Sequence, residues 1–357
     1  MTSGPASAGS GAGLVEPSAP DHGGGLDAAC AEYGGTRADW LDLSTGINPV
    51  PYPHADIPLS AWTDLPDRAA HDALVAAARA FWQVPDRLRI LPTPGTSAAI
   101  AHLPLLAPSA SRKPPVVHIR RRTYNEHAAA FRRAGWRVAH ADPLAPGFAD
   151  AGVIVHPDNP TGDLWPEPGA DRPKLLVIDE SFGECAPDTS LIDHAGGGTV
   201  LLKGLGKFWG LAGLRLGFVI GAPDRLAPMA AALGPWPVSG PALHLGARAL
   251  RNAGWIAATR NRIGTDAARL DAVMTPHLKP DSPPRGTTLF RLYTVPDAKA
   301  LQTRLARARI WSRAFPYDPQ WIRLGLPGTK ADWTRLETAL AAIADPASAA
   351  ASGPSAP

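Results

Sequence analysis

Hydrophobic and polar positions along the chain follow two alternating patterns. Short runs rich in β-branched residues predict strands at Val116–Ile119, Val153–His156, Leu175–Asp179, Val200–Lys203 and Leu216–Ile220. Between these runs, apolar residues recur at helical spacing, which predicts helices at Arg68–Trp82, Thr96–Leu106, Asn125–Ala134 and one long helix within Pro241–Met274. Strands that alternate with helices are typical of an α/β fold with a largely parallel sheet covered by helices.

The pattern changes after the long helix, which predicts a second, smaller α+β domain. Its expected elements are strands at Thr287–Tyr293 and near Ile310 and Trp321, and helices at Ala298–Ala308 and Ala331–Ile343. We therefore expect an N-terminal arm (21–50) that belongs to the small domain, a large domain (51–240), and a linking helix with the small domain (241–345). Residues 1–20 and 346–357 are rich in Gly, Ala, Ser and Pro and are predicted to be disordered tails.

Composition narrows the classes of protein that remain. The net charge is +3, but the 35 basic residues are spread along the chain, which argues against a nucleic-acid partner. Cys30 and Cys185 lie far apart without a metal-ligand spacing, so we expect no disulfide, no metal and a reducing, cytoplasmic location. The first twenty residues lack the features of a secretory signal, and no apolar run is long enough to span a bilayer. The prediction is a soluble protein without a membrane partner.

Lysine 207 stands in a glycine-rich turn just after a predicted strand, in the segment Lys203-Gly-Leu-Gly-Lys207-Phe-Trp-Gly-Leu-Ala-Gly-Leu-Arg215. An amine that is partly desolvated and close to another cation has the lowered pKa that a nucleophile needs to attack an aldehyde. A solvated loop lysine is the alternative. A nucleotide-binding P-loop is excluded, because Phe208 stands where that motif requires Ser or Thr.

Three further polar segments also lie at predicted strand ends or helix starts. Asp179 ends a buried strand and is either a helix cap or a partner for a pyridine nitrogen. Asn159, in Asn-Pro-Thr-Gly, lies in a turn and could aim its amide at a ring oxygen. Gly95, Thr96 and Ser97 open a helix, where free backbone N–H groups suit a phosphate or simply form a cap.

Taken together, these segments resemble the class I/II aminotransferase superfamily, which has the pyridoxal-phosphate (PLP) fold type I with a mixed, mostly parallel sheet in a large cofactor-binding domain. The resemblance covers about residues 21–345. It implies that PLP is the cofactor and that Lys207 is the Schiff-base lysine. It also implies roles for eight other positions: Arg215 with Gly95, Thr96 and Ser97 at the cofactor phosphate, Asp179 at the pyridine nitrogen, Asn159 at the ring oxygen, Tyr124 stacked on the ring, and Arg323 at the substrate carboxylate.

Within this superfamily, His22-Gly23-Gly24, the segment Leu41–Pro49 and Asp-Glu-Ser-Phe are most similar to the threonine-phosphate decarboxylases of cobalamin biosynthesis. The resemblance implies decarboxylation of L-threonine O-3-phosphate, with transamination by a histidinol-phosphate aminotransferase as the alternative. Relatives carry hydroxyl residues where this chain has Gly204 and Gly206, so Lys203 could supply part of the phosphate site. Phe182 also replaces a common tyrosine.

Both substrates carry a phosphate, so a second anion site is expected. Arg120, in the run Arg120–Arg122, and His22 are the candidates, and Gly23 and Asn48 are also predicted to contact substrate. The resemblance further implies a homodimer. A serine hydrolase is excluded because the chain has no Gly-x-Ser-x-Gly elbow, and a DNA-binding regulator because no segment is left for a helix-turn-helix domain.

Overall fold

The computed structural model describes residues 23–107, 113–144, 149–169, 172–278, 280 and 282–344. The two predicted tails and His22 lie outside these residues. In the described part of the chain, no helix combines the length and the apolar character that a membrane span requires.

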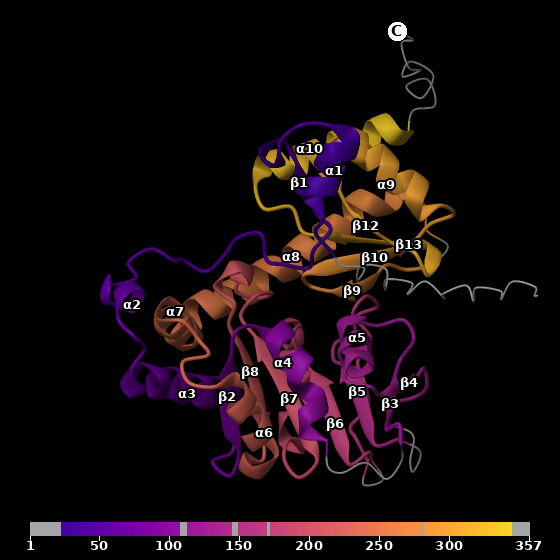
Figure 1. The fold of residues 1–357 in the computed structure, drawn as a ribbon. Coiled ribbons are helices and arrows are strands. Elements are labelled where there is room, and N and C mark those ends of the chain that lie inside the picture. The colour runs from indigo at the N-terminus through magenta and orange to yellow at the C-terminus, as the bar shows by residue number, and fades with distance from the viewer. Residues whose placement is uncertain are drawn as a thin grey trace, which may run out of the picture.

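A large sheet forms the core of the lower, larger unit in Figure 1. In the described residues it has seven strands in the order β2-β8-β7-β6-β5-β3-β4. The strands are β2 (Arg89–Thr93), β3 (Val116–Ile119), β4 (Arg137–Ala139), β5 (Ala151–Val155), β6 (Leu175–Asp179), β7 (Thr199–Gly204) and β8 (Gly217–Gly221). Strand β8 is antiparallel to both of its neighbours, whereas the other pairs are parallel. This is the mixed, mostly parallel sheet that the sequence predicts.

Helices cover both faces of the sheet because its strands are apolar on both sides. On one face lie α3 (Arg68–Trp82), α7 (Gly240–Arg251) and α8 (Ala253–Leu278), which share a core with Leu176, Ile178 and Leu201. On the other face lie α4 (Thr96–His102), α5 (Glu126–Arg133) and α6 (Pro223–Leu233), which pack with Val177, Val200 and Leu202. Successive residues of each strand therefore point to different helical layers.

The C-terminal part forms a smaller unit above the sheet edge (Figure 1). Its antiparallel sheet has the order β12-β13-β10-β9, with β9 (Arg285–Thr287), β10 (Phe290–Thr294), β12 (Arg313–Phe315) and β13 (Asp318–Gly325). Helices α9 (Ala298–Arg307) and α10 (Lys330–Ala344) accompany it. Near the N-terminus, α1 (Leu26–Tyr33) contacts α9, and β1 (Leu41–Asp42) pairs in parallel with β11 (Ile310–Trp311). Residues from both ends of the described chain thus build this unit.

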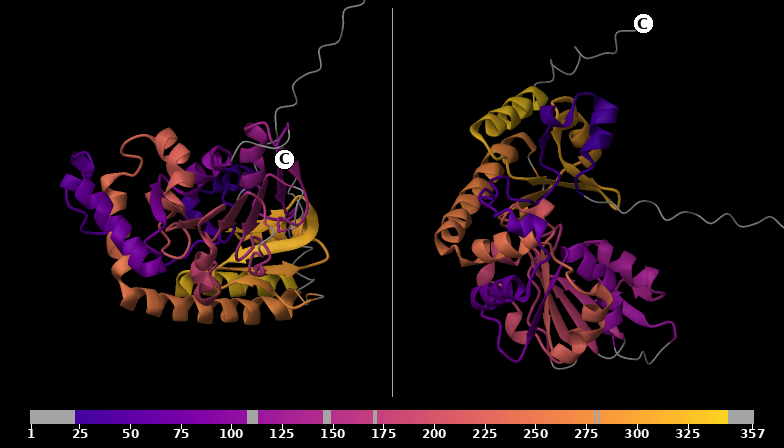
Figure 2. Two further views of the ribbon diagram at one scale, coloured as in Figure 1. Left: turned by 90° about the horizontal axis from the view of Figure 1, so that it is seen from below. Right: turned by 60° about the vertical axis from the view of Figure 1, so that its left-hand side comes forward.

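Helix α8 runs as a long rod along the two units, which both views of Figure 2 show. The predicted single helix in this region is in fact two, because the chain breaks between α7 and α8 at Asn252. The predicted strand Thr287–Tyr293 is likewise two strands, β9 and β10, joined by a tight turn. Helix α3 has the predicted bounds, and the Asp67 side chain caps it by accepting a hydrogen bond from the Ala70 amide at 2.8 Å.

Candidate active site

The polar segments singled out above meet at one edge of the large sheet. Strands β2, β3, β5, β6 and β7 all end at this edge, since they run in the same direction. Arg215 reaches the same edge although it precedes a strand, because β8 runs the opposite way. Here an inner cavity of about 130 Å³ is lined by Thr96, Ser97, Tyr124, Asn159, Asp179, Phe182, Lys207 and Arg215, among others. The structure therefore brings together seven of the eight predicted cofactor-binding residues in one lining.

Asp179 forms the inner end of the site and is held by three hydrogen bonds. Its Oδ2 lies 2.8 Å from His127 Nε2, and its Oδ1 accepts from the Ser181 amide at 2.9 Å and the Ser181 hydroxyl at 2.6 Å. Burial alone would raise the pKa of Asp179, but the hydrogen bond and charge of His127 and the bonds from Ser181 hold it below its usual value. An ionised carboxylate has about four acceptor sites, so it can still accept from a protonated ring nitrogen.

Lys207 is buried, and the pKa of its amine is lowered. Burial, followed by the nearby charge of Arg323, lowers the pKa of Lys207 from 10.5 to about 8, and Asp179 opposes this shift only in part. Its Nζ lies 5.5 Å from the centre of the Phe182 ring. The neutral amine, which is the form that attacks an aldehyde, is therefore far more abundant at neutral pH than in an ordinary lysine.

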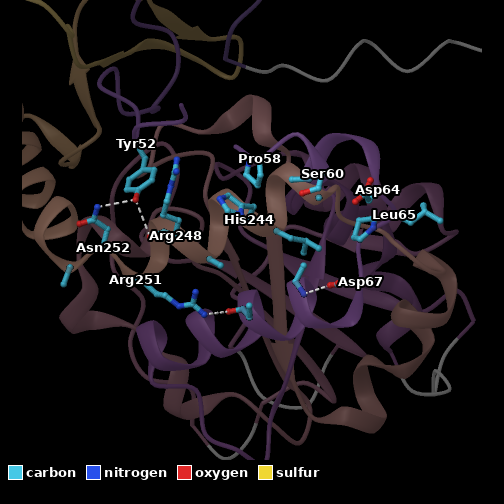
Figure 3. A pocket seen from close by; sticks show the side chains of 18 residues that line it. Tyr52, Pro58, Ser60, Asp64, Leu65, Asp67, His244, Arg248, Arg251 and Asn252 are labelled. Carbon is cyan, nitrogen blue, oxygen red and sulfur yellow. Dashed lines mark hydrogen bonds between the residues drawn. The ribbon is translucent and has the colours of Figure 1, made fainter. Parts of the chain in front are cut away.

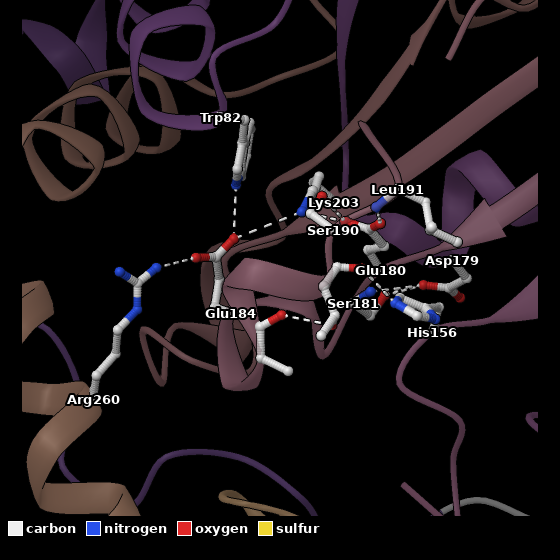
Figure 4. Close-up of polar contacts among 12 residues, drawn as sticks. Trp82, His156, Asp179, Glu180, Ser181, Glu184, Ser190, Leu191, Lys203 and Arg260 are labelled. Carbon is white, nitrogen blue, oxygen red and sulfur yellow. Dashed lines mark hydrogen bonds and ion pairs between the residues drawn. The ribbon is translucent and has the colours of Figure 1, made fainter. Parts of the chain in front are cut away.

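Lys203 does not belong to this site, contrary to the suggestion that it completes the phosphate contacts. The alternation of β7 points Lys203 toward α3, on the face opposite to Gly204. There its Nζ pairs with Glu180 Oε2 at 2.5 Å and lies 3.8 Å from Glu184, with side chains only 3% and 0% exposed for Lys203 and Glu180 (Figure 4). The cations that lower the pKa of Lys207 are instead Arg323 and Arg215.

The start of α4 lies against Arg215. Gly95 has a φ of 86°, which side chains rarely allow, and a Cβ atom there would lie 2.7 Å from the Arg215 guanidinium in its present position. Arg215 itself has a left-handed backbone, with φ of 54°, which is uncommon for a residue with a side chain. Gly204 also faces this point, since its Cβ would lie 2.8 Å from Thr96 Oγ1. The Thr96 hydroxyl thus fills the space that a hydroxyl residue at position 204 would use.

Tyr124 lines the inner cavity and also a second, outer cavity described below. Burial and the charge of Asp179 raise its pKa to about 12, so its hydroxyl is neutral, and this hydroxyl hydrogen-bonds with Ser97. Its ring lies edge-on to His127, with centroids 6.0 Å apart.

An outer cavity of about 320 Å³ opens from the same residues toward the small unit. Arg323 on β13 lines it, donating to Asn159 Oδ1 and, at 2.8 Å, to the Ser44 carbonyl. Arg313 on β12 stands directly opposite Arg323 in the strand register. Like charges in facing positions repel one another, so this pair favours an anion between them. Among the described residues of this lining, Lys207, Arg313 and Arg323 are basic and only Glu126 is acidic.

The predicted substrate contacts are only partly brought together. Gly23 lines the outer cavity, and its Cβ would lie 3.4 Å from Arg323. The Arg120 side chain turns toward the loop after β5 and lines a separate surface pocket. There it pairs with Asp163 at 3.1 Å, and 42% of the side chain is exposed. Asn48 is buried against the Lys207 turn and lines neither cavity, because its amide satisfies backbone groups there. His22 lies outside the described residues.

Two residues of the site were missed in the sequence. The first is His127, the partner of Asp179, which lies on the face of α5 that packs against the sheet; a histidine among alanines there was a weak signal. The second is Arg313, for which the only signal was its place on a strand beside Arg323. Neither position can be paired with its partner without knowing the register of the strands or the packing of the helix.

Comparison with known proteins identifies the class of protein. The sequence profile described as aminotransferase class I and II matches residues 58–343, and this chain belongs to that family. The chain is 43% identical to a threonine-phosphate decarboxylase of Sinorhizobium sp, over 90% of this chain and 97% of that protein. It is 38% identical to a threonine-phosphate decarboxylase of Pseudomonas aeruginosa, over 92% and 99% of the two chains.

A solved structure supports the fold. The histidinol-phosphate aminotransferase of Sinorhizobium meliloti, in complex with pyridoxal-5'-phosphate, superimposes with a TM-score of 0.75 over 90% of this chain and 94% of that one. At 18% identity this likeness shows the shared fold. The predicted fold class and family resemblance are therefore confirmed.

Proposed function

We propose that this chain is a PLP-dependent decarboxylase that converts L-threonine O-3-phosphate to (R)-1-aminopropan-2-yl phosphate and CO2 in cobalamin biosynthesis. The observation that carries the proposal is the similarity, over nearly their full length, to two proteins named threonine-phosphate decarboxylase. The two adjoining cavities support it, because the inner one suits a cofactor and the outer one a substrate with two anionic groups. We place the enzyme in the cytoplasm, where the free thiols of Cys30 and Cys185 would stay reduced.

The residues of the inner cavity fit the proposed cofactor. The start of α4 with Thr96 and Ser97, together with Arg215, would bind its phosphate. Asp179 would hold the proton on its ring nitrogen, and Asn159 would face its ring oxygen. We assign the covalent bond to Lys207, and Tyr124 would pack on the ring. When bound, PLP supplies an electron sink for the bond that breaks at the α-carbon of the substrate.

The chain's own groups would then orient the substrate and move a proton. Arg323, fixed by Asn159 and the Ser44 carbonyl, would hold the substrate carboxylate with its planar guanidinium. The direction in which Arg323 would hold the carboxylate would decide whether CO2 is lost. Lys207 Nζ would return a proton to the α-carbon after CO2 has left. A proton removed from that carbon instead would lead to transamination.

Arg313 is the proposed ligand of the substrate phosphate, in place of Arg120. It faces Arg323 across β12 and β13 and lines the cavity that contains Lys207. A guanidinium can donate two parallel hydrogen bonds to a phosphate, and such charge-assisted bonds are about twice as strong as neutral ones. Gly23, without a side chain, leaves room beside Arg323 for the substrate.

A homodimer is the proposed assembly. Three large apolar side chains around α2 (Ser60–Thr63) are mostly exposed, with values of 74% for Leu59, 65% for Trp62 and 71% for Leu65. Leu65 lines an open groove of about 750 Å³ between α2, α3 and α7, which Figure 3 shows from close by, and Leu59 and Trp62 are next in sequence to Ser60 and Ala61, which also line it. Apolar surface gathered in this way is typical of a protein interface, and the proposed partner is a second copy of the chain.

Product analysis tests the proposed reaction. Purified protein loaded with PLP is given threonine phosphate, and CO2 and aminopropanol phosphate are measured; equal amounts of the two are expected. Threonine without the phosphate should react much more slowly, because the contact with Arg313 is lost. If histidinol phosphate and 2-oxoglutarate yield glutamate while threonine phosphate releases no CO2, the chain is an aminotransferase and the proposal is wrong.

A further inference from the structure

Asn48 is buried beside the turn that carries Lys207. It is 2% exposed, and its backbone amide donates to the Lys207 carbonyl at 3.0 Å. Its side-chain Nδ2 donates to the carbonyl of the next residue, Phe208, at 2.8 Å. One asparagine thus binds two successive carbonyl groups of this turn, from a segment about 160 positions earlier in the chain.

The other side of the Asn48 amide is fixed from helix α8. Asn48 Oδ1 accepts from Arg262 Nη2 at 2.5 Å and from the Val50 amide at 3.0 Å. Arg262 is in turn held by Asp266, one helical turn further on, at 3.0 Å. Because a guanidinium only donates, Arg262 orients the asparagine with its oxygen toward α8 and its NH2 group toward Phe208.

The backbone around this contact is closely packed. The Tyr52 amide donates to the Trp209 carbonyl at 2.8 Å, so residues 48–52 run alongside residues 207–209. A Cβ atom at Gly210 would lie 2.7 Å from the Asn48 carbonyl oxygen, which leaves no room for a side chain there. Gly204, Gly206 and Gly210 lie in or beside the Lys207 turn, and these three positions have no side chain that could hold it.

We propose that Asn48 is a positioning residue for Lys207, and that Arg262 fixes Asn48 in the orientation this task needs. The inference rests on the proposed function, in which Lys207 binds the cofactor and returns a proton to the α-carbon. Helix α8, which runs along both units (Figure 2), is thereby connected to the Lys207 turn through Arg262 and Asn48. Asn48 itself lines neither cavity, so its effect would pass through the backbone of the turn.

Three variants separate this role from simple packing. Asn48→Ala removes the three side-chain hydrogen bonds, to Phe208, Arg262 and Val50. Asn48→Asp keeps the volume and the acceptor for Arg262 and Val50, but it cannot donate to Phe208. Arg262→Ala leaves Asn48 in place without its orienting partner. Asn261→Ala and Arg269→Ala are the matched controls, because Asn261 is exposed on the same helix and Arg269 pairs with Glu337 away from the site.

For each variant we would measure kcat, KM, the thermal midpoint, and the pH at which the visible absorption of the bound cofactor changes. We expect Asn48→Ala and Asn48→Asp to lower kcat by about 10- to 100-fold with KM changed less than about threefold, as for a small misplacement of a reacting group. The pH midpoint of the absorption should move in both, and the two controls should match the unaltered protein. The Asn48→Ala and Arg262→Ala effects on kcat should combine to less than their product, because they act through one contact.

The outcomes distinguish a failure of the proposed function from a failure of the positioning role of Asn48. If the unaltered protein releases no CO2 from threonine phosphate, the proposed function fails. If it does, but both Asn48 variants keep the kcat and the pH midpoint of the unaltered protein, the positioning role is wrong. It is equally wrong if the variants lose thermal stability while kcat and the pH midpoint stay unchanged in the folded fraction. Should Asn48→Ala not fold, Asn48→Asp and Arg262→Ala decide the matter by the same measurements.

Discussion

The lowered pKa of Lys207 predicts how the cofactor-free protein reacts with PLP as the pH changes. With a pKa of about 8 instead of 10.5, the neutral amine makes up about 10% of the total at pH 7 rather than about 0.03%. This is a gain of about 300-fold in reactive amine, equivalent to about 3 kcal/mol. The rate of attachment should therefore rise about tenfold per pH unit up to pH 8 and level off above it.

The sign of the linked effect on stability follows from the same pKa. Between about pH 8 and pH 10.5, the unfolded chain still carries a proton on this lysine that the folded protein has lost. The cofactor-free protein should thus become more stable as the pH rises through this window, as far as Lys207 contributes.

Stopped-flow mixing with PLP at a series of pH values measures the attachment rate through the visible absorption that appears. Arg323→Met provides the perturbation, because the charge of Arg323 is the largest cause of the lowered pKa after burial. Its midpoint should move to higher pH, whereas Arg269→Met should leave it unchanged, because Arg269 pairs with Glu337 on α10 and lines neither cavity. A rate that keeps rising to pH 10 in the unaltered protein, or an identical midpoint in Arg323→Met, would refute the reasoning.

Three other predictions follow from single contacts. Arg313→Leu should raise KM for threonine phosphate by about 10- to 100-fold, since a hydrogen bond to a charged group contributes about 1.5–3 kcal/mol, while the affinity for PLP stays the same; steady-state kinetics and a PLP titration measure the two, and an unchanged KM would exclude the phosphate contact. Lys203→Met should lower the free energy of unfolding by about 3–5 kcal/mol, because Glu180 is left buried without its partner. Denaturant unfolding measures this change, and an unchanged midpoint of unfolding would contradict the prediction. Trp62→Glu should shift the protein from dimer to monomer in sedimentation; a monomeric unaltered protein, or a dimer that survives the charge, contradicts the proposed interface.

Much of the large sheet could be predicted because each strand carries its own signal. Strands β3 and β6 have the predicted bounds, and their apolar residues face helices on both sides. The polar residues that follow such strands meet at one edge whatever the details of packing, so Asp179, Asn159 and Lys207 were recognisable as a group.

The structure differs from the prediction where a side chain's position depends on the face of its strand or on a partner that is distant in the sequence. Lys203 was suggested as part of the phosphate site, although the alternation of Leu202, Lys203 and Gly204 along β7 places it opposite Gly204. For Arg120 and Asn48 no such local rule exists, because Asp163 and Arg262 hold them from distant parts of the chain. The sequence motifs that contain Arg120 and Asn48 therefore do not predict where these two side chains point.

The central claim is a covalent bond between PLP and one particular amine. Reduction of the PLP-loaded protein with borohydride makes this bond permanent, and mass spectrometry of the digested protein then locates it. We expect the added mass on the peptide that contains Lys207, and none after Lys207→Ala. Added mass on another lysine such as Lys203, or none at all, would contradict the account.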